Sequence, residues 1–272
     1  MLKQVVKALT PPVLYAAARR WKIPPMSPSG EYEFVPEGWS AVSLSSGWNT
    51  RSILDYYQEQ WPEFFKSVAG TQPQLLPVGY GQLAGHNVIA CFSYALALAA
   101  HGKPQLSMLD WGGDIGHYYL RSRAALPDVP IDYHCKDVPL LAEYGRSLFP
   151  EASFYTDKSC FNRTYDFVLA STSLHYSEDW RQDLTALAHS THGCLLLNRL
   201  PCHHRAGSYV YRHRALGSEF LSWSLNAEEV LDCAADAGLT LRREFLISDG
   251  PQPIKNAPSP SVMRAYLFRR LS

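Results

Sequence analysis

The chain of 272 residues is long enough for one large α/β domain with an appendage, or for two small domains. Its 25 basic and 25 acidic residues give a formal net charge of zero, which argues against a strongly basic nucleic-acid-binding surface. A hydrophobic content of 46% and a charged content of 18% are ordinary for a soluble globular protein, and we expect no nucleic-acid partner.

The cysteines and the N-terminus indicate the compartment. The six cysteines are scattered and form no Cys-x-x-Cys pair, so we interpret them as free thiols in a reducing cytoplasm. No apolar run reaches the length of about 20 residues that spans a bilayer. The apolar start is interrupted by Pro11 and Pro12, which argues against a secretory signal. Basic residues in a short predicted helix, residues 12–22, allow at most peripheral contact with a membrane surface.

The first hundred residues are predicted to be mainly helical. Apolar spacing and flanking Pro and Gly predict helices over residues 12–22, 39–69 and 87–100. Residues 22–38 are rich in Pro, Gly and Ser and read as a connecting segment, and residues 71–85 read as a second loop. We therefore predict a helical N-terminal extension, residues 1–100, that packs as a cap on a core domain, residues 101–272.

The most informative segment opens that core. A short apolar run ends in Asp110, a turn with Gly112, Gly113 and Gly116 follows, and the next residues can start a helix. In an open α/β sheet, a ligand binds outside the carboxyl end of such a strand, where glycines let the backbone approach it closely. The acid precedes the glycines, so the segment is not the G-x-G-x-x-G fingerprint of dinucleotide binding. A sugar-modifying nucleotide-dependent oxidoreductase is therefore the weaker alternative.

From this segment onward, predicted strands and helices alternate. The predicted strands cover residues 106–110, 131–137, 153–157, 165–171 and 193–199, and the clearest helices cover 138–149 and 178–190, the latter with Ser177 as N-cap. Asn226-Ala-Glu-Glu229 resembles a capping box for a helix that ends at Gly238. Two strands without a helix between them, residues 241–248 and 262–270, are predicted to be antiparallel. This order predicts an α/β fold with a mostly parallel Rossmann-like sheet, an antiparallel C-terminal edge pair and helices on both faces.

Acids follow the second and third predicted strands. An acid about 20 residues past a glycine turn is the usual ligand of ribose hydroxyls, and Asp137 lies at that distance from Gly116. A carboxylate can accept from both hydroxyls at once. Asp137 could equally cap the helix that begins near Pro139. Asp157, after the third strand, is positioned to accept from an adenine amino group, or is simply exposed.

The fourth and fifth strands end in polar residues that we expect at the same crevice. Ser171 is a candidate cofactor contact and Tyr176 a candidate substrate contact. His175 is a candidate general base, for which activity would rise with pH through a pKa near 6.5. After the fifth strand, Arg199 could bind a carboxylate or phosphate of a substrate, and His203 is the competing base.

We expect no metal site in this region. Cys202, His203 and His204 are consecutive, so they cannot easily close one tetrahedral site, and no partner pair of ligands follows at finger-like spacing.

From about residue 100 to its end, the chain resembles the class I S-adenosylmethionine-dependent methyltransferases. The resemblance is carried by Asp110-x-Gly112-x-x-x-Gly116, the acid after the second strand, Tyr-Asp-Phe-Val-Leu-Ala-Ser171, the Asn-Ala-Glu-Glu229 helix start and the final strand pair. It implies S-adenosylmethionine as cofactor, held by the residues named above, no metal, and methyl transfer by displacement at the sulfonium. Asp114 stands where the usual turn has glycine. It tolerates a left-handed backbone, and its carboxylate could contact the cofactor or crowd the site.

Three details are similar to a narrower family of methyltransferases found with bacterial O-antigen and surface-polysaccharide genes. They are the early Pro-Pro helix, Ser-Leu-His175-Tyr, and Leu-Asn-Arg199-Leu-Pro. This resemblance implies a cytoplasmic bacterial enzyme that O-methylates a sugar or glycan intermediate, with an oligomer as an open possibility. The alternative from another class is a non-catalytic scaffold that has lost turnover.

Overall fold

The computed structural model describes residues 32–40, 47–69, 80–248 and 250–270, so the helix predicted at residues 12–22 lies outside the described residues. The strands are β1 Tyr32–Phe34, β2 Leu106–Trp111, β3 Ile131–Lys136, β4 Ser153–Tyr155, β5 Tyr165–Ser171, β6 Thr191–His203, β7 Tyr209–Ala215, β8 Ser218–Asn226, β9 Leu239–Leu246 and β10 Val262–Arg270. The helices are α3 Arg51–Ala69, α4 Tyr80–Ala100, α5 His117–Ala125, α6 Pro139–Leu148, α7 Trp180–His189 and α8 Ala227–Asp236, with 3₁₀ turns η1 Lys158–Asn162 and η2 Leu174–Tyr176.

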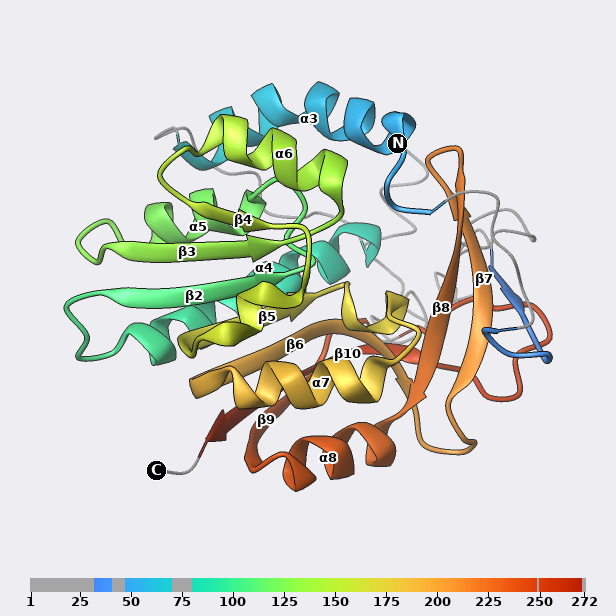
Figure 1. Cartoon of the computed structure of the whole chain (residues 1–272). Helices are drawn as coiled ribbons and strands as arrows, with labels where there is room; N and C mark the ends of the chain where they lie inside the picture. The colour runs from blue at the N-terminus through green and yellow to red at the C-terminus, as the bar shows by residue number, and fades with distance from the viewer. Residues whose placement is uncertain (1–31, 41–46, 70–79, 249, 271–272) are drawn as a thin grey trace, which may run out of the picture.

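The main sheet has the strand order β4-β3-β2-β5-β6-β10-β9 (Figure 1). The neighbours from β4 to β6 are parallel, whereas β10 is antiparallel to both β6 and β9. The predicted fold class, a mostly parallel sheet with an antiparallel C-terminal edge pair, is confirmed. All parallel strands therefore end along one edge, which we call the carboxyl edge, and begin along the opposite amino edge.

Two apolar clusters bury the two faces of this sheet. On one face, Phe92 and Leu96 of α4 pack with Met108 and Phe167, together with residues of α5. On the other face, residues of α7 and α8 pack with Val168, Leu195 and their neighbours. Strands buried on both sides explain the nearly continuous apolar runs of β5 and β6.

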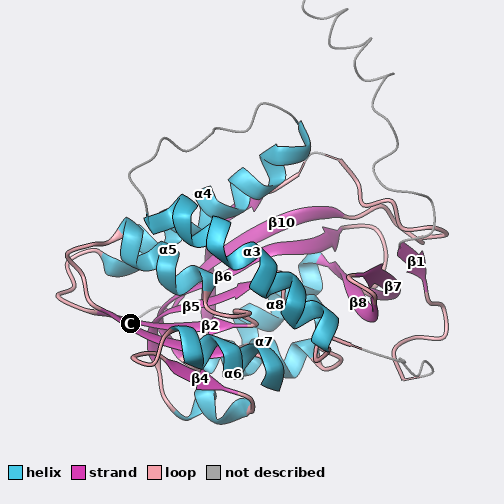
Figure 2. Cartoon of the chain, turned by 90° about the horizontal axis from the view of Figure 1, so that it is seen from above, coloured by secondary structure: helices cyan, strands magenta, loops and turns pink. Residues whose placement is uncertain are grey.

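A second, small antiparallel sheet lies at the carboxyl edge, where Figure 2 shows β1, β7 and β8 grouped at one end of the molecule. It is continuous with the main sheet because Cys202 of β6 pairs with Leu225 of β8. The sequence analysis missed this hairpin. Its two-residue turn, Leu216–Gly217, has positive φ at both residues (53° and 72°), as a type I′ turn requires. Gly217 between two alternating runs was the available signal.

The N-terminal part differs from the expected extension in three ways. The helix predicted over 39–69 begins only at Arg51. β1 lies in the predicted connecting segment, because pairing with β7 imposes a strand there. α4 begins at Tyr80, inside the predicted loop, and its inner face is part of the core described above. The division into residues 1–100 and 101–272 stays a prediction about domains.

α4 also corrects the statement that no apolar run could span a membrane. The segment Leu83–Ala100 passes that test by length and composition, with a mean hydropathy of 1.5. In this structure 39% of it is buried, and the buried side chains are those packed against β5 and β6. The helix therefore covers the sheet with one face and leaves Leu83, Tyr94 and Leu98 exposed on the other.

Two predicted helix starts had different outcomes. Ser177 is not the N-cap of α7, because η2 extends to this point and α7 begins only at Trp180. The Ser177 hydroxyl instead donates to Asp183 Oδ2 at 2.5 Å. Asn226 does cap α8, since its side chain accepts from the Glu229 amide at 3.1 Å.

Candidate functional site

The glycine turn between β2 and α5 adopts a backbone that requires its glycines. Gly112 and Gly116 have φ of 74° and 95°, in the left-handed region. A Cβ at Gly112 would lie 2.3 Å from Cβ of Ser173, and a Cβ at Gly113 would lie 2.5 Å from Oδ2 of Asp110. The glycines therefore also satisfy close packing within the protein, beside any approach of a ligand.

Asp110 is fully buried at the end of β2. Tyr133 donates to its Oδ2 at 2.5 Å, while its Oδ1 has no hydrogen-bond partner. Burial raises the pKa of Asp110 to about 7, and the neighbouring Asp137 adds to the rise. A buried carboxylate oxygen without a partner is costly, so this atom is a candidate contact for a bound donor.

Asp137 directly follows β3, as predicted, but the N-cap of α6 is Val138, which has no side-chain capping hydrogen bond. Asp137 Oδ2 accepts from the Asp114 amide at 2.8 Å and its Oδ1 accepts from the Val138 amide at 2.7 Å. Burial raises the pKa of Asp137 to about 6, although these backbone hydrogen bonds oppose the rise. The alternative of a helix cap is therefore wrong for α6. Each oxygen keeps a further lone pair, and the ribose contact stays a prediction.

Asp114 occupies the turn with φ of 54°, in the left-handed region that its residue type tolerates. The Tyr57 hydroxyl from α3 donates to its Oδ1 at 2.7 Å. Burial, and then the charge of Asp137, raises the pKa of Asp114 well above its ordinary range. The turn thus gathers the carboxylates of Asp110, Asp114 and Asp137, and the charge of Asp137 raises the pKa of the other two.

Ser171 and Asp157 have different surroundings. Ser171 is 9% exposed and hydrogen-bonds the Tyr118 hydroxyl of α5 at 2.8 Å, next to the turn. Asp157 is exposed and accepts from the Ser159 amide and hydroxyl at 2.9 Å and 2.5 Å, so that it caps η1. Its predicted adenine contact has no support from this position and stays a prediction.

His175, Tyr176 and Arg199 come together after β5 and β6. The rings of His175 and Tyr176 have centroids 4.3 Å apart, and Tyr176 hydrogen-bonds His213 of β7 at 3.2 Å. Burial, and then the nearby charge of Arg199, lowers the pKa of His175 to about 3. This burial gives the expected titration near 6.5 no support, and that titration stays a prediction. Its Nδ1 has no partner.

Arg199 is aimed by an irregularity in β6. The pairing of β6 with β10 shifts by one residue around Asn198 and Arg199, which is the pattern of a β-bulge. Arg199 has φ of 56° and is exposed, beside the small sheet that carries His213. Bulges commonly re-aim a side chain next to a functional site.

His203 lies in different surroundings from His175. It is buried beyond the bulge, with its ring stacked on Tyr209 at 5.1 Å, and neither ring nitrogen has a partner. Burial lowers the pKa of His203. His203 packs on Tyr209 near Glu228 and Glu229, whereas His175 packs on Tyr176 near Arg199 and His213, so the two candidate bases have different neighbours.

The candidate metal cluster next to His203 is dispersed. Cys202 is buried, and His204 pairs with Glu228 at 2.8 Å. Within the described ranges, no group of three or more His, Cys, Asp or Glu side chains is arranged to hold a metal ion. Among these residues every cysteine is a free thiol, and only Cys233 is not buried.

Backbone strain is concentrated at the carboxyl edge. Of the five described non-glycine residues with positive φ, Asp114 and Thr172 follow β2 and β5. Arg199 lies within β6, next to Asn198, which pairs with Ser171 at the end of β5. The other two are Leu216 and Asn256. Four buried polar atoms without partners lie in the same region: Asp110 Oδ1, Trp111 Nε1, His175 Nδ1 and Asn198 Oδ1. Further such atoms lie on His203, in the small sheet and on β10. Strain and unsatisfied polar atoms together are typical of functional sites.

One cavity lies away from these strand ends. A space of about 1100 Å³ opens near the amino edge, between the C-terminal ends of α3, α5 and α6, and is lined by Val68, Leu120, Ile131 and Phe149 among others. We place more weight on the strand ends, because ligands of parallel α/β sheets bind outside the carboxyl ends of strands.

Four residues at the candidate site escaped the sequence analysis: Tyr57, Tyr118, Ser173 and His213. Ser173 lies in the predicted polar loop, and its hydroxyl donates to the Trp111 carbonyl at 2.6 Å. Tyr118 follows the glycine turn directly, so its position was a usable signal. Tyr57 and His213 come from distant elements, and no local pattern indicates them.

No protein-family model matches this sequence, and no curated protein matches it. Among solved structures, the chain is similar to the magnesium protoporphyrin IX methyltransferase of Synechocystis PCC 6803 with bound SAM, with 16% identity, coverage of 80% of this chain and 95% of that chain, and a TM-score of 0.49. It is also similar to the sugar N-methyltransferase KedS8 from Streptoalloteichus sp. ATCC 53650, with 16% identity, coverage of 75% and 97%, and a TM-score of 0.42. A third is the SAM-bound amino pentose methyltransferase CalS10 from Micromonospora echinaspora, with 14% identity, coverage of 74% and 100%, and a TM-score of 0.44. At these identities the likeness concerns the fold.

Proposed function

We propose that this chain is an S-adenosylmethionine-dependent methyltransferase whose site is the carboxyl edge of β2, β3, β5 and β6. The observation that carries the proposal is the coincidence of strain and unsatisfied buried polar atoms at these strand ends, around an Asp-x-Gly-x-x-x-Gly116 turn. The amino edge, which has comparable polar residues, lacks this combination among the described residues.

The residues of the turn fit the proposed cofactor by their chemistry. Asp137 offers carboxylate lone pairs for ribose hydroxyls, and Asp110 Oδ1 and Trp111 Nε1 are an acceptor and a donor without partners. Gly112, Gly113 and Gly116 would allow close approach of the ligand, with Ser171 next to the turn. S-adenosylmethionine, when bound, supplies a methyl group on a sulfonium that is already a good leaving group.

The second half of the site would hold the acceptor. Exposed Arg199 presents a fork of donors suited to a carboxylate or phosphate, and Tyr176 lies among the rings of His213, Phe220 and Trp48. Nδ1 of His175 is unpaired, so it could accept a hydrogen bond from an acceptor hydroxyl, while its lowered pKa makes it a weak proton acceptor. His203 would act only if the acceptor extends along β6.

For the acceptor, we propose a sugar or glycan intermediate of bacterial cell-surface polysaccharide, O-methylated in the cytoplasm. Support comes from the resemblance of the Ser-Leu-His175-Tyr and Leu-Asn-Arg199-Leu-Pro segments and from the aromatic surroundings of Tyr176, since sugar rings pack well on aromatic faces. The zero net charge supports a small-molecule or glycan partner rather than nucleic acid.

Calorimetry with S-adenosylmethionine and S-adenosylhomocysteine tests the cofactor. We expect binding of both with comparable affinity, and about 10- to 100-fold weaker binding by Asp137→Ala, the equivalent of a lost hydrogen bond to a charged group. Absence of heat with either ligand at millimolar concentration would overturn the proposal. Transfer of a labelled methyl group into extracts of the native host would then identify the acceptor.

A non-catalytic scaffold is the second candidate. It is favoured by Asp114 in place of glycine and by the tight packing of Ser173 on Gly112. Binding of S-adenosylhomocysteine without methyl transfer to any extract would favour a domain that retained the site and lost turnover. Absence of both binding and methyl transfer would favour a domain with a structural role alone.

A further inference from the structure

The structure assigns a role at the turn to α3, a helix outside the α/β core. We infer that Tyr57 is a positioning residue: its hydrogen bond to Asp114 holds the glycine turn in the conformation that cofactor binding needs. This inference rests on the proposed function, because the turn is there taken as the cofactor site.

The first step concerns the backbone of Asp114. A non-glycine residue with φ of 54° is strained and persists only where its surroundings hold it. Here both ends of the residue are held. Its amide donates to Asp137 Oδ2 at 2.8 Å, and its carboxylate accepts from Tyr57 at 2.7 Å.

The second step concerns charge. Asp114 lies with Asp110 and Asp137, so its carboxylate faces like charges in a largely buried place. The Tyr57 hydroxyl donates a hydrogen bond to this carboxylate, and this hydrogen bond favours the ionised form of Asp114. Burial, and then Asp114 itself, raises the pKa of Tyr57 well above its ordinary range, so the hydroxyl keeps its proton and remains a donor.

The third step is that α3 is fixed against the turn. Ile53 and Leu54 are buried in a cluster with Ile115, which is itself a residue of the turn. Phe64 and Trp61 contact the ring of His117, the first residue of α5, with centroids 4.5 Å and 5.5 Å away. α3 therefore forms an outer wall of the turn, and Tyr57 reaches Asp114 from a rigid position.

This arrangement accounts for the departure from the usual glycine. Glycine at this position would adopt a positive φ without strain and would carry no charge, so it would need no support from α3. With aspartate, support is required, and Tyr57 gives it. Replacement of Asp114 by glycine should therefore remove the requirement for Tyr57.

The test is a set of S-adenosylhomocysteine titrations by calorimetry on the full chain and on Tyr57→Phe, Asp114→Gly and the double variant. Tyr56→Phe is the matched control, since Tyr56 is the adjacent ring, 42% exposed. We expect about tenfold weaker binding by Tyr57→Phe, no change for Tyr56→Phe, and no further loss when Tyr57→Phe is added to Asp114→Gly. Circular dichroism verifies that each variant is folded.

Each outcome of these titrations supports or overturns the inference about Tyr57. Unchanged affinity of Tyr57→Phe would overturn the inference while the proposed function stands, as would an equal loss in the Asp114→Gly background, which would indicate general packing of α3. If the unaltered chain binds no S-adenosylhomocysteine, the proposed function fails and this inference fails with it.

Discussion

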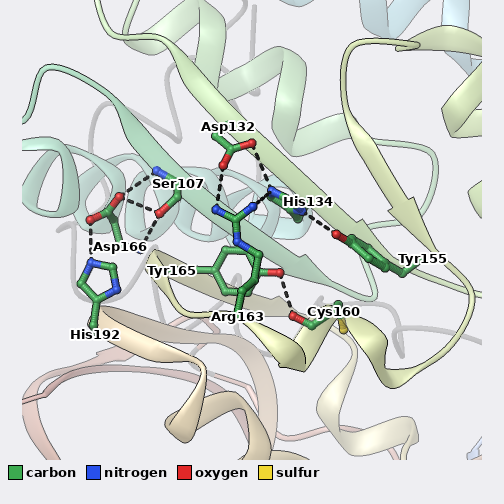
Figure 3. A network of polar contacts seen from close by, with 9 residues as sticks. All are labelled: Ser107, Asp132, His134, Tyr155, Cys160, Arg163, Tyr165, Asp166 and His192. Carbon is green, nitrogen blue, oxygen red and sulfur yellow. Dashed lines mark hydrogen bonds and ion pairs between the residues drawn. The ribbon is translucent and has the colours of Figure 1, made fainter.

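The two edges of the main sheet use similar residues in opposite ways. At the amino edge, Asp166 accepts from the Ser107 amide and hydroxyl at 2.8 Å and 2.7 Å and pairs with His192 at 2.9 Å (Figure 3). It also accepts from Lys103 Nζ at 2.5 Å. At the carboxyl edge, Asp110 has one partner and one empty oxygen. One carboxylate is surrounded by cations and donors, and the other by further carboxylates.

A second network at the amino edge follows the same rule. Figure 3 shows Asp132, His134, Tyr155 and Arg163 joined in one chain of contacts, with Arg163 donating to Asp132 at 2.9 Å. None of these groups is a buried atom without a partner. The comparison teaches that satisfied networks pin the starts of the strands, whereas the strand ends keep unsatisfied polar atoms at a cost in stability.

The largest expected effect is at the amino edge. Asp166→Ala removes a carboxylate that links the starts of β5, β2 and β6, and should lower the free energy of unfolding by roughly 2–4 kcal/mol. Denaturant titration measures this loss. Affinity for S-adenosylhomocysteine should not change once the protein is folded; a large loss of affinity would break the division between the two edges.

The Asp166 carboxylate also affects the stability of the fold at acid pH. Although burial opposes it, hydrogen bonds from Lys103 and Ser107 hold the pKa of Asp166 well below its ordinary value of 3.8. Because the pKa of Asp166 is lower in the folded protein than in the unfolded chain, its contribution to stability is complete above about pH 4 and is lost as the pH falls toward the folded pKa. Asp166→Asn should therefore flatten the decline in stability below about pH 4.

The next effect has the opposite sign and lies at the carboxyl edge. Asp110→Asn should raise the free energy of unfolding at pH 7 by about 2 kcal/mol, because it removes a buried carboxylate whose pKa is raised to about 7. The folded protein keeps the Asp110 proton that the unfolded chain releases, so stability should fall as the pH rises from about 4 to about 7. Thermal melting across this range checks whether the slope disappears in the variant. S-adenosylhomocysteine binding should weaken at the same time.

A smaller gain is expected at the bulge. Arg199→Gly should stabilise the fold by about 0.5–1 kcal/mol, because glycine accepts the positive φ without strain, yet it should impair use of the acceptor. Asn256→Gly is the matched control: Asn256 is exposed with φ of 60°, so glycine should be tolerated there with acceptor kinetics unchanged. Normal acceptor kinetics in Arg199→Gly would remove Arg199 from the site.

The smallest expected effect is an unchanged shape of the pH–rate profile in a His175 variant. Because His175 is neutral above a pKa of about 3, His175→Gln should lower the methyl-transfer rate without removing any inflection between pH 5 and 8. Single-turnover rates at several pH values measure this. An inflection near pH 6.5 that vanishes in the variant would show that His175 titrates normally during turnover.

The sequence predicted the main sheet well because its strands are long apolar runs that follow one another with helices between them. Strand β5 has the predicted bounds, and β2, β3 and β10 differ by at most a residue. It missed β1, β7 and β8, whose pairing depends on contacts between distant segments. At the site, the turn and Asp137 could be predicted from spacing, whereas Tyr57 and His213 could not, since they reach the site only through tertiary packing.

β6 belongs to two sheets, with thirteen residues that cross from the main sheet into the small one. At about 3.3 Å per residue this strand is about 40 Å long. Its first part is buried in the main sheet, and the β7–β8 hairpin pairs with it near the other end. The bulge at Arg199 interrupts the regular pairing of β6 between its main-sheet part and the residues that pair with β8. The Asn198 carbonyl beside it accepts from the Thr172 amide at 2.9 Å, so a tilt of the hairpin would be transmitted through β6 to the loop after β5 without passing through solvent.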